Sequence, residues 1–192
     1  MIVVKRNSNQ QTDGSVGGGS AGGGSSGAVL AGFPGGLVAG AASWADYKEL
    51  AGFHYAAGAP AVPCAVAGVW HEQDGERTLA GVAVVSHPTL RNACREAVLG
   101  VPEEGRAAWV NKHVRAITRV IVHPTYRGLG VGKLLVRQAI DAVRQMPEVR
   151  FVEATARMGR FHPLFEKCGM VRCVMGGLTG DKPAYFFVMV RS

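Results

Sequence analysis

Apolar residues recur at helical spacing in two parts of the chain. The first repeat predicts a short helix over 45–55. The second begins near Val131, stops at Met146-Pro147, and alternates with charged residues, so it predicts a longer helix packed on a sheet. The apolar positions that carry the two repeats are Trp44, Tyr47, Leu50, Ala51, Val131, Leu134, Leu135, Ala139, Ala142 and Val143.

Runs of β-branched and apolar residues predict the strands. The first two should form an antiparallel hairpin, because a polar turn over 71–77 joins them. Two further short helices are expected over 92–98 and 161–168. This order of elements indicates one mixed α/β domain. The expected strands are 65–70, 79–85, 116–122, 150–155, 171–175 and 185–190.

The first residues of the chain differ in composition from the rest. Residues 16–27 are almost entirely Gly and Ser, and such a tract cannot bury enough apolar surface to offset its ordering entropy. We therefore expect a flexible tail or linker over 1–27 and a folded domain over 28–192. The 192 residues are 47% hydrophobic and 18% charged, as in globular proteins.

Charge and cysteine content narrow the class of partner. A formal net charge of +7 favours anionic partners such as nucleotide cofactors or nucleic acid. The four cysteines form no CxxC pair, which favours a reducing, cytoplasmic setting. No stretch is apolar and uninterrupted enough for a membrane span, and no metal-ligand cluster stands out, so we expect neither a membrane nor a metal partner. The sequence does not indicate an oligomeric state.

A glycine-rich loop joins the strand at 116–122 to the long helix. Its three glycines, Gly128, Gly130 and Gly132, let the backbone turn sharply and bring its N–H groups close to a bulky anion. The helix start adds unpaired amides and the positive end of a dipole, and Arg127 and Lys133 add charge. The loop therefore predicts a phosphate or pyrophosphate site.

Two common phosphate-binding motifs fit this loop poorly. A P-loop requires Ser or Thr after the lysine, but Leu134 follows Lys133. A Rossmann fingerprint requires Gly-x-Gly-x-x-Gly, and too little chain follows Glu153 for a second nucleotide-binding half. A glycine turn that only permits tight strand–helix packing would not require Arg127.

The stretch from Ile117 to Leu135 resembles the acyl-CoA-binding motif of the GCN5-related N-acetyltransferase (GNAT) superfamily, and 161–170 resembles its second segment. The resemblance implies a single GNAT-like acyltransferase domain with a largely antiparallel sheet, splayed central strands and flanking helices. It implies acetyl-CoA as acyl donor and an amine as acceptor. The donor would be held by backbone groups of Val120, Ile121 and Val122 and by the loop. The implied loop residues are Arg127, Gly128, Leu129, Gly130, Val131, Gly132 and Lys133.

The residues for acid and base catalysis depart from the family pattern. Phe165 stands where the family has a thiol-protonating tyrosine, and Thr118 stands where it often has a glutamate base. Glu153, in a strand expected to line the acyl site, is a candidate base. His54 and Tyr55 could supply base and acid, because an imidazole beside a phenol can exchange protons near neutral pH. Each could equally be structural.

Three functional hypotheses follow. The first is an acetyl-CoA-dependent N-acyltransferase whose amine attacks the thioester directly. The second rests on a looser similarity of 54–55, 86–88 and 156–163 to Mom-like phage proteins that modify adenine in DNA, for which the basic charge would face a duplex. The third is a non-catalytic module that binds CoA or nucleic acid.

Overall fold

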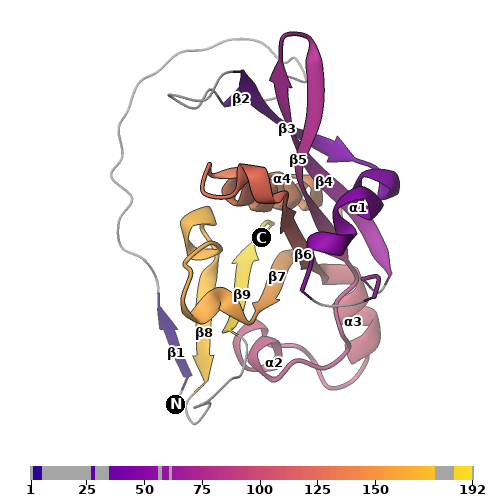
Figure 1. Ribbon diagram of the computed structural model, residues 1–192. Helices are drawn as coiled ribbons and strands as arrows, with labels where there is room; N and C mark the ends of the chain where they lie inside the picture. The colour runs from indigo at the N-terminus through magenta and orange to yellow at the C-terminus, as the bar shows by residue number, and fades with distance from the viewer. Residues whose placement is uncertain are drawn as a thin grey trace, which may run out of the picture.

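A mixed β-sheet forms the centre of the molecule (Figure 1). The computed structural model describes residues 2–5, 27–28, 35–55, 58–60, 62–175 and 184–191. Within them the strands are ordered β1-β8-β9-β7-β6-β5-β4-β3-β2. The strand bounds are β1 Ile2–Lys5, β2 Gly27–Ala28, β3 Gly36–Ala42, β4 Pro63–Gln73, β5 Glu76–Ser86, β6 Val114–Val122, β7 Phe151–Ala156, β8 Val171–Met175 and β9 Ala184–Met189.

Two neighbouring strands at the centre of the sheet separate along their length. The strands β6 and β7 are parallel and pair only from Val114↔Phe151 to Ile117↔Ala154. On its other side β6 remains paired with β5 as far as Gly81↔Val122. The remaining neighbours in the sheet are antiparallel. The predicted antiparallel sheet with splayed central strands is therefore confirmed.

Helices cover both faces of this sheet. In Figure 1, α4 lies across one face and α1 across the other, while α2 and α3 lie together near one end of β6 and β7. The helix bounds are α1 Trp44–Leu50, α2 Ala93–Leu99, α3 Arg106–His113 and α4 Val131–Arg144. Short 3-10 turns are η1 Ala51–Phe53, η2 Pro124–Tyr126, η3 Met158–Arg160 and η4 Glu166–Cys168.

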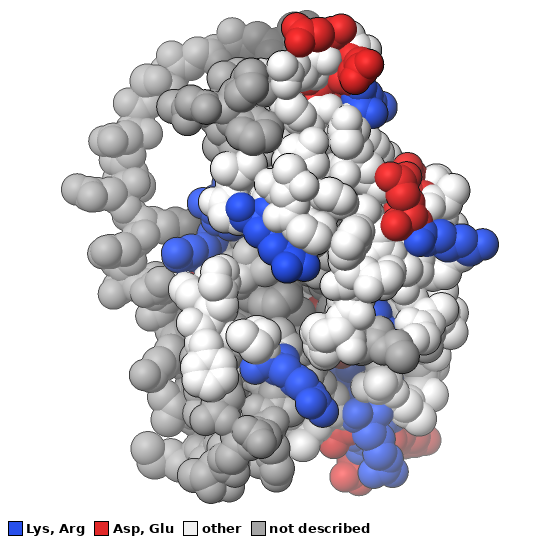
Figure 2. Space-filling model, in the orientation of Figure 1, with Lys and Arg blue, Asp and Glu red and all other residues white. Residues whose placement is uncertain are grey.

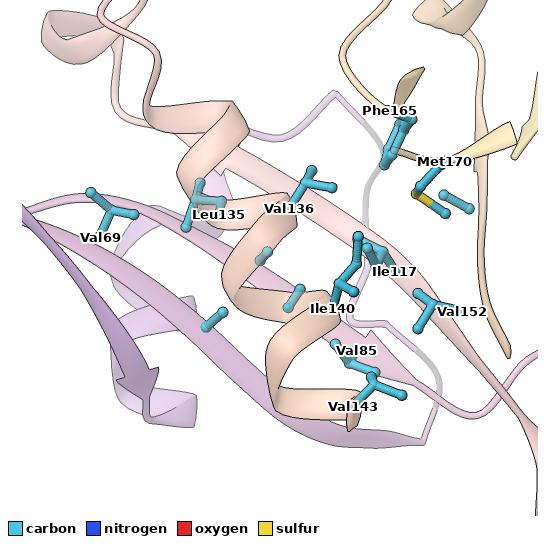
Figure 3. Close-up of a cluster of buried hydrophobic side chains, with 14 of the residues drawn as sticks. Val69, Val85, Ile117, Leu135, Val136, Ile140, Val143, Val152, Phe165 and Met170 are labelled. Atoms are coloured by element: carbon cyan, nitrogen blue, oxygen red, sulfur yellow. The ribbon is translucent and has the colours of Figure 1, made fainter. Parts of the chain in front are cut away.

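Each face of the sheet has its own hydrophobic core. Figure 3 shows Leu135, Val136, Ile140 and Val143 of α4 directed onto the sheet, where they join the larger cluster. The smaller cluster lies under α1. Because both faces are covered, β5 is buried at every position from 79 to 86, and 79–85 form a continuous apolar run. The smaller cluster consists of Tyr47, Leu50, Trp70, Leu79, Val82, Val84 and Ile121.

A glycine in β5 sets how closely α4 approaches the sheet. A Cβ at Gly81 would lie 2.8 Å from the carbonyl oxygen of Ile121 and 2.9 Å from Cδ1 of Leu135. Only a residue without a side chain fits there, so the start of α4 packs closely on β5 beside the end of β6. This contact fixes the loop that joins them.

The structure corrects several predicted elements. Strand β3 and helix α3 were not predicted, because β3 is built from Gly, Ala and only two larger residues, and α3 has a weak apolar repeat. The predicted helix over 161–168 is wrong: the segment forms turns, with Gly169 ending η4 in the left-handed region. The β4–β5 hairpin is longer than expected, with its turn at Asp74-Gly75.

The predicted division at residue 27 falls mostly outside the described residues. Within 1–27, only 2–5 and Gly27 are described. The backbone of Ile2–Lys5 pairs with β8, although the predicted tail includes these residues, and their β-branched run explains the pairing. The flexible tail therefore stays a prediction for the rest. No helix among the described residues has the length and apolar character needed to cross a membrane.

Candidate functional site

The loop between β6 and α4 has the backbone conformation that its glycines allow. Gly128 and Gly130 have φ angles of 83° and 84°, in the left-handed region that disfavours other residues. Gly130 is the N-cap of α4, and no side chain caps the helix. A side chain at Gly128 would meet nothing within 4 Å, so the loop opens onto free space.

The amides around the start of α4 differ in whether they are hydrogen-bonded within the described residues. Hydrogen bonds are found for the amides of Arg127, which donates to Pro124 O, and of Lys133 and Leu134, which donate to Gly130 O. Within the described part of the chain, no such bond is found for the amides of 128–132. A run of unpaired amides at a helix N-terminus is the arrangement that binds phosphate.

The loop is held in place from below by a buried tyrosine. The amide of His123 donates to Ala80 O at 3.0 Å, which continues the pairing of β6 beyond its last residue. The η2 turn follows, and its Tyr126 is 7% exposed with its hydroxyl 3.3 Å from Nδ1 of His71. The burial of Tyr126 and its hydrogen bond to His71 of β4 therefore fix the position of the loop relative to the sheet.

A groove leads from this loop to the point where β6 and β7 separate. Its outer part lies between the start of α4 and η1, and its inner part is a cleft of about 220 Å³ over the splayed strands. The two parts share His54, Tyr55, Val120 and Leu164. The outer part is also lined by Phe53, Val122, Arg127 and Gly132. The inner cleft is also lined by Ile117, Thr118, Arg119, Thr155, Ala156, Arg157, Met158, Gly159, His162 and Phe165.

The predicted cofactor residues divide into side-chain and backbone positions. Val120, Val122, Arg127 and Gly132 line the groove. Ile121 is 3% exposed and points into the core under α1, so only its backbone faces the open edge of β6. The remaining loop residues differ in exposure: Val131 is buried in the α4 core, Leu129 is half-buried, and Gly128 and Lys133 are exposed.

Three of the four predicted catalytic residues reach the cleft. His54 and Tyr55 stack with ring centroids 4.5 Å apart and lie at its mouth. Thr118 lies at the splay, where its Oγ1 is 2.9 Å from Oγ of the buried Ser86 and donates to Val84 O at 3.3 Å. Since that hydroxyl donates its proton to the backbone, Ser86 is the donor in the bond between them. Thr118 is thus held by the sheet and cannot replace a glutamate base.

The fourth predicted residue, Glu153, is not brought to the cleft. Its side chain is buried and accepts hydrogen bonds from Arg95 Nη1 at 2.9 Å and from the Tyr185 hydroxyl at 2.9 Å. Burial raises the pKa of Glu153 above its ordinary value, against the opposing effect of Arg95. The pKa of Tyr185 is also raised, first by burial and then by the Glu153 charge. Glu153 therefore belongs to a buried ion pair outside the cleft lining, and its role as a base stays a prediction.

Sequence reasoning missed the residue that holds Glu153. Arg95 is completely buried on α2, 58 residues away along the chain. A single arginine in a short helix carries no signal of such a pairing. Phe165, by contrast, lies where expected: it lines the cleft and stacks on Phe186 at 5.0 Å, which leaves a hydrocarbon ring where the resembled family has a phenol.

Known structures share this architecture. NAA60 of Arabidopsis thaliana, solved in complex with acetyl-CoA, matches with a TM-score of 0.54 and 15% sequence identity, covering 80% of this chain and 98% of that chain. A variant of the spermidine N-acetyltransferase SpeG from Vibrio cholerae matches with a TM-score of 0.53 and 11% identity, covering 80% of this chain and 94% of that chain. At these identities the likeness shows the fold. No curated protein matches the chain.

The sequence itself also matches a family model, described as the acetyltransferase (GNAT) family, over residues 40–170. This span contains the loop, the splayed strands and the cleft. It covers well over half of the 192 residues. The chain belongs to the acetyltransferase (GNAT) family.

Proposed function

We propose that the chain is an N-acyltransferase that moves an acetyl group from acetyl-CoA to an amine. One observation carries the proposal: a single groove runs from the unpaired amides at the start of α4, along the open edge of β6, to the cleft where β6 and β7 part. A pyrophosphate, an extended arm and a thioester need these three environments in this order. NAA60, of similar fold, was solved with acetyl-CoA and with a bisubstrate analogue.

Each part of the groove fits one part of the donor. Amides of 128–132, with Arg127 beside them, would hold the pyrophosphate. Beyond Ile117 the edge of β6 facing β7 is not paired with it, so backbone groups from 118 to 122 would bind the pantetheine amides as an added strand. The acetyl group would then lie over Thr118 in the cleft.

The chemistry in the cleft is attack by a neutral amine on the thioester carbon. The amine forms the new C–N bond, the C–S bond breaks, and the amine proton leaves while CoA departs as thiol or thiolate. His54 and Tyr55 are the titratable pair at the cleft mouth that we propose to receive and supply protons. Phe165 donates no proton, so protonation of the thiolate falls to Tyr55 or to water.

Donor binding is tested by a matched pair of glycine substitutions. Gly128 and Gly75 both have a φ angle of 83° and open space where a Cβ would lie, so a glutamate is equally strained at either position. In Gly128→Glu the new carboxylate occupies the phosphate site and repels the anion. We expect acetyl-CoA affinity, measured by titration calorimetry, to fall by about tenfold or more.

The control, Gly75→Glu, lies in the β4–β5 turn and should bind acetyl-CoA as the wild type does. Undiminished affinity in Gly128→Glu, or equal losses in both variants, would refute the proposed donor site. The two other hypotheses have their own tests. Modified adenine in the DNA of an expression host would favour the Mom-like reaction, and tight CoA binding without thiol release from any acceptor would favour a binding module.

A further inference from the structure

The inner cleft carries positive charge and no acid among the described residues that line it. It is lined by Arg119 on β6 and by Arg157 just before η3, and His54 and His162 add two imidazoles. No Asp or Glu side chain of the described chain lines either part of the groove. On the face drawn in Figure 2, acidic side chains gather at the β4–β5 tip and toward the edges, whereas basic ones also cross the middle.

Neither arginine is neutralised within the described part of the chain. Arg119 donates to two backbone carbonyls, Thr118 O at 2.9 Å and Gly58 O at 3.5 Å, and its Nε is buried with no hydrogen-bond partner there. Arg157 is exposed, and among the described residues no ion pair or hydrogen bond is found for its side chain. Two guanidinium groups in one cleft, with no carboxylate from the described residues, favour an anion between them.

The same charges disfavour a cationic acceptor. An ammonium group that enters a cleft lined by guanidinium groups is repelled, so the neutral form of the amine is favoured there. A larger fraction of neutral amine favours reaction in a site where Thr118 stands in place of a carboxylate base. A polyamine would instead carry several positive charges into a cleft that has no carboxylate from the described residues to receive them.

We infer that the acceptor is a primary amine that also bears an anionic group, a phosphate or a carboxylate, which Arg119 and Arg157 bind. The inference rests on the proposed function and specifies its substrate class. The anion holds the molecule in the cleft, and the amine then faces the thioester over Thr118. Tyr55, a residue that is 74% exposed at the cleft mouth, offers a stacking surface for an acceptor with a planar ring.

The test compares amines that differ only in the anion. Pyridoxamine 5′-phosphate is compared with pyridoxamine, glycine with glycinamide, and spermidine serves as the polycation. Each is titrated by calorimetry into protein saturated with CoA, and thiol release from acetyl-CoA is then measured with the same amines. We expect the anion-bearing member of at least one pair to bind about tenfold tighter or more, with spermidine weakest, since a charge-assisted hydrogen bond has that magnitude.

Variants then assign the preference to the two arginines. Arg119→Gln and Arg157→Gln should each reduce the affinity ratio within the preferred pair toward one, while Arg91→Gln, an exposed arginine outside the cleft lining, should leave it unchanged. Thermal unfolding verifies that each variant is folded. Preference for the phosphate pair or for the glycine pair identifies the anion.

Several results would overturn the inference. They are equal affinities within both pairs, strongest binding of spermidine, no detectable binding of either anionic amine, or a ratio unchanged in both arginine variants. Failure of the proposed function looks different: acetyl-CoA itself would not bind, before any amine is added. If acetyl-CoA binds and a cationic or neutral amine is the better acceptor, the enzyme assignment stands and only the acceptor class is wrong.

Discussion

The buried ion pair between α2 and β7 allows a direct test of whether Glu153 is structural. Arg95 donates to the Glu153 carboxylate at 2.9 Å and to Thr89 O and Leu90 O at 2.6 and 2.8 Å. Arg95→Met keeps most of the side-chain volume but removes Arg95 as a hydrogen-bond donor to Glu153. Of the two donors described above for that carboxylate, only the Tyr185 hydroxyl then remains. Removing one member of a buried pair costs about 3–5 kcal/mol, because the other charge stays buried.

That cost is large beside the total stability of a domain, which is roughly 5–15 kcal/mol. For a chain of this size it corresponds to a fall in Tm of roughly 6–20 °C. We would measure the free energy of unfolding by urea titration with circular dichroism at pH 7. Arg144→Met is the matched control: Arg144 pairs with Asp141, but both side chains are about half exposed, at 51% and 54%, so its loss costs about 0–1 kcal/mol.

The pH dependence gives a second check. Because burial already raises the pKa of Glu153, and loss of Arg95 raises it further, the native Arg95→Met variant binds a proton more tightly than the unfolded chain. The loss of stability in Arg95→Met should therefore be complete at pH values above the raised pKa of Glu153. It should shrink as the pH falls toward 4.5, the ordinary pKa of a glutamate. Arg95→Met combined with Glu153→Leu should recover much of the lost stability, since no charge remains buried.

A structural role for the pair is refuted if Arg95→Met costs no more than Arg144→Met. The catalytic alternative for Glu153 has a distinct signature in Glu153→Gln. A base would lose kcat by orders of magnitude with little change in unfolding. A structural acid would lose stability while acetyl-CoA affinity stays within about twofold of wild type, a difference of less than about 0.5 kcal/mol.

Two further outcomes follow from packing and from thiol chemistry. Gly81→Ala should destabilise the domain by about 1–3 kcal/mol in urea unfolding, because the new methyl group overlaps the backbone of Ile121. The control Gly36→Ala should not destabilise it, because no atom lies within 4 Å of the new methyl group, and equal costs would contradict the close approach of α4. Burial, with Cys173 nearby, raises the pKa of the Cys94 thiol to about 11. The rate of Cys94 alkylation by iodoacetamide should therefore rise about tenfold per pH unit from about pH 7.5 to 9.5, and it should stay below the rate at the exposed Cys64. A rate that is independent of pH would refute this.

Those elements of the fold that carry a local signal were predictable. The α4 repeat and the β6 run indicate a buried helix and strand, and both lie where expected. Strand β3 carries no such signal, because Gly and Ala have little strand propensity. It forms because β4 offers a full edge to pair with and because Leu37, 1% exposed, enters the α4 core. Because β3 is stabilised by these tertiary contacts and not by its own residues, no local stretch of sequence predicts it.

The same distinction applies to the site. The loop was predictable because Gly128 and Gly130 adopt left-handed φ angles, a conformation that glycine adopts readily and other residues disfavour. The location of the cleft between β6 and β7 was predictable, but the residues that line it were not. Its lining depends on which segments come to cover β6 and β7, and those segments include 54–55 and 155–165, which are about 100 residues apart in the chain. Arg119 faces the cleft from β6 only because β7 diverges after Ala154.

The misplacement of Glu153 shows what strand periodicity leaves undecided. Glu153 and Thr155 lie two residues apart on the same side of β7, about 7 Å along the strand. Alternation assigns both to one side, but α2 brings Arg95 over the first and leaves the second in the cleft. The only acid of β7 thereby lies outside the cleft lining, whereas Arg119 and Arg157 line the cleft without an ion-pair partner among the described residues. Under the proposed function, an amine that reacts there reaches the thioester neutral, and an anion on the same molecule is the feature best able to hold it between the two arginines.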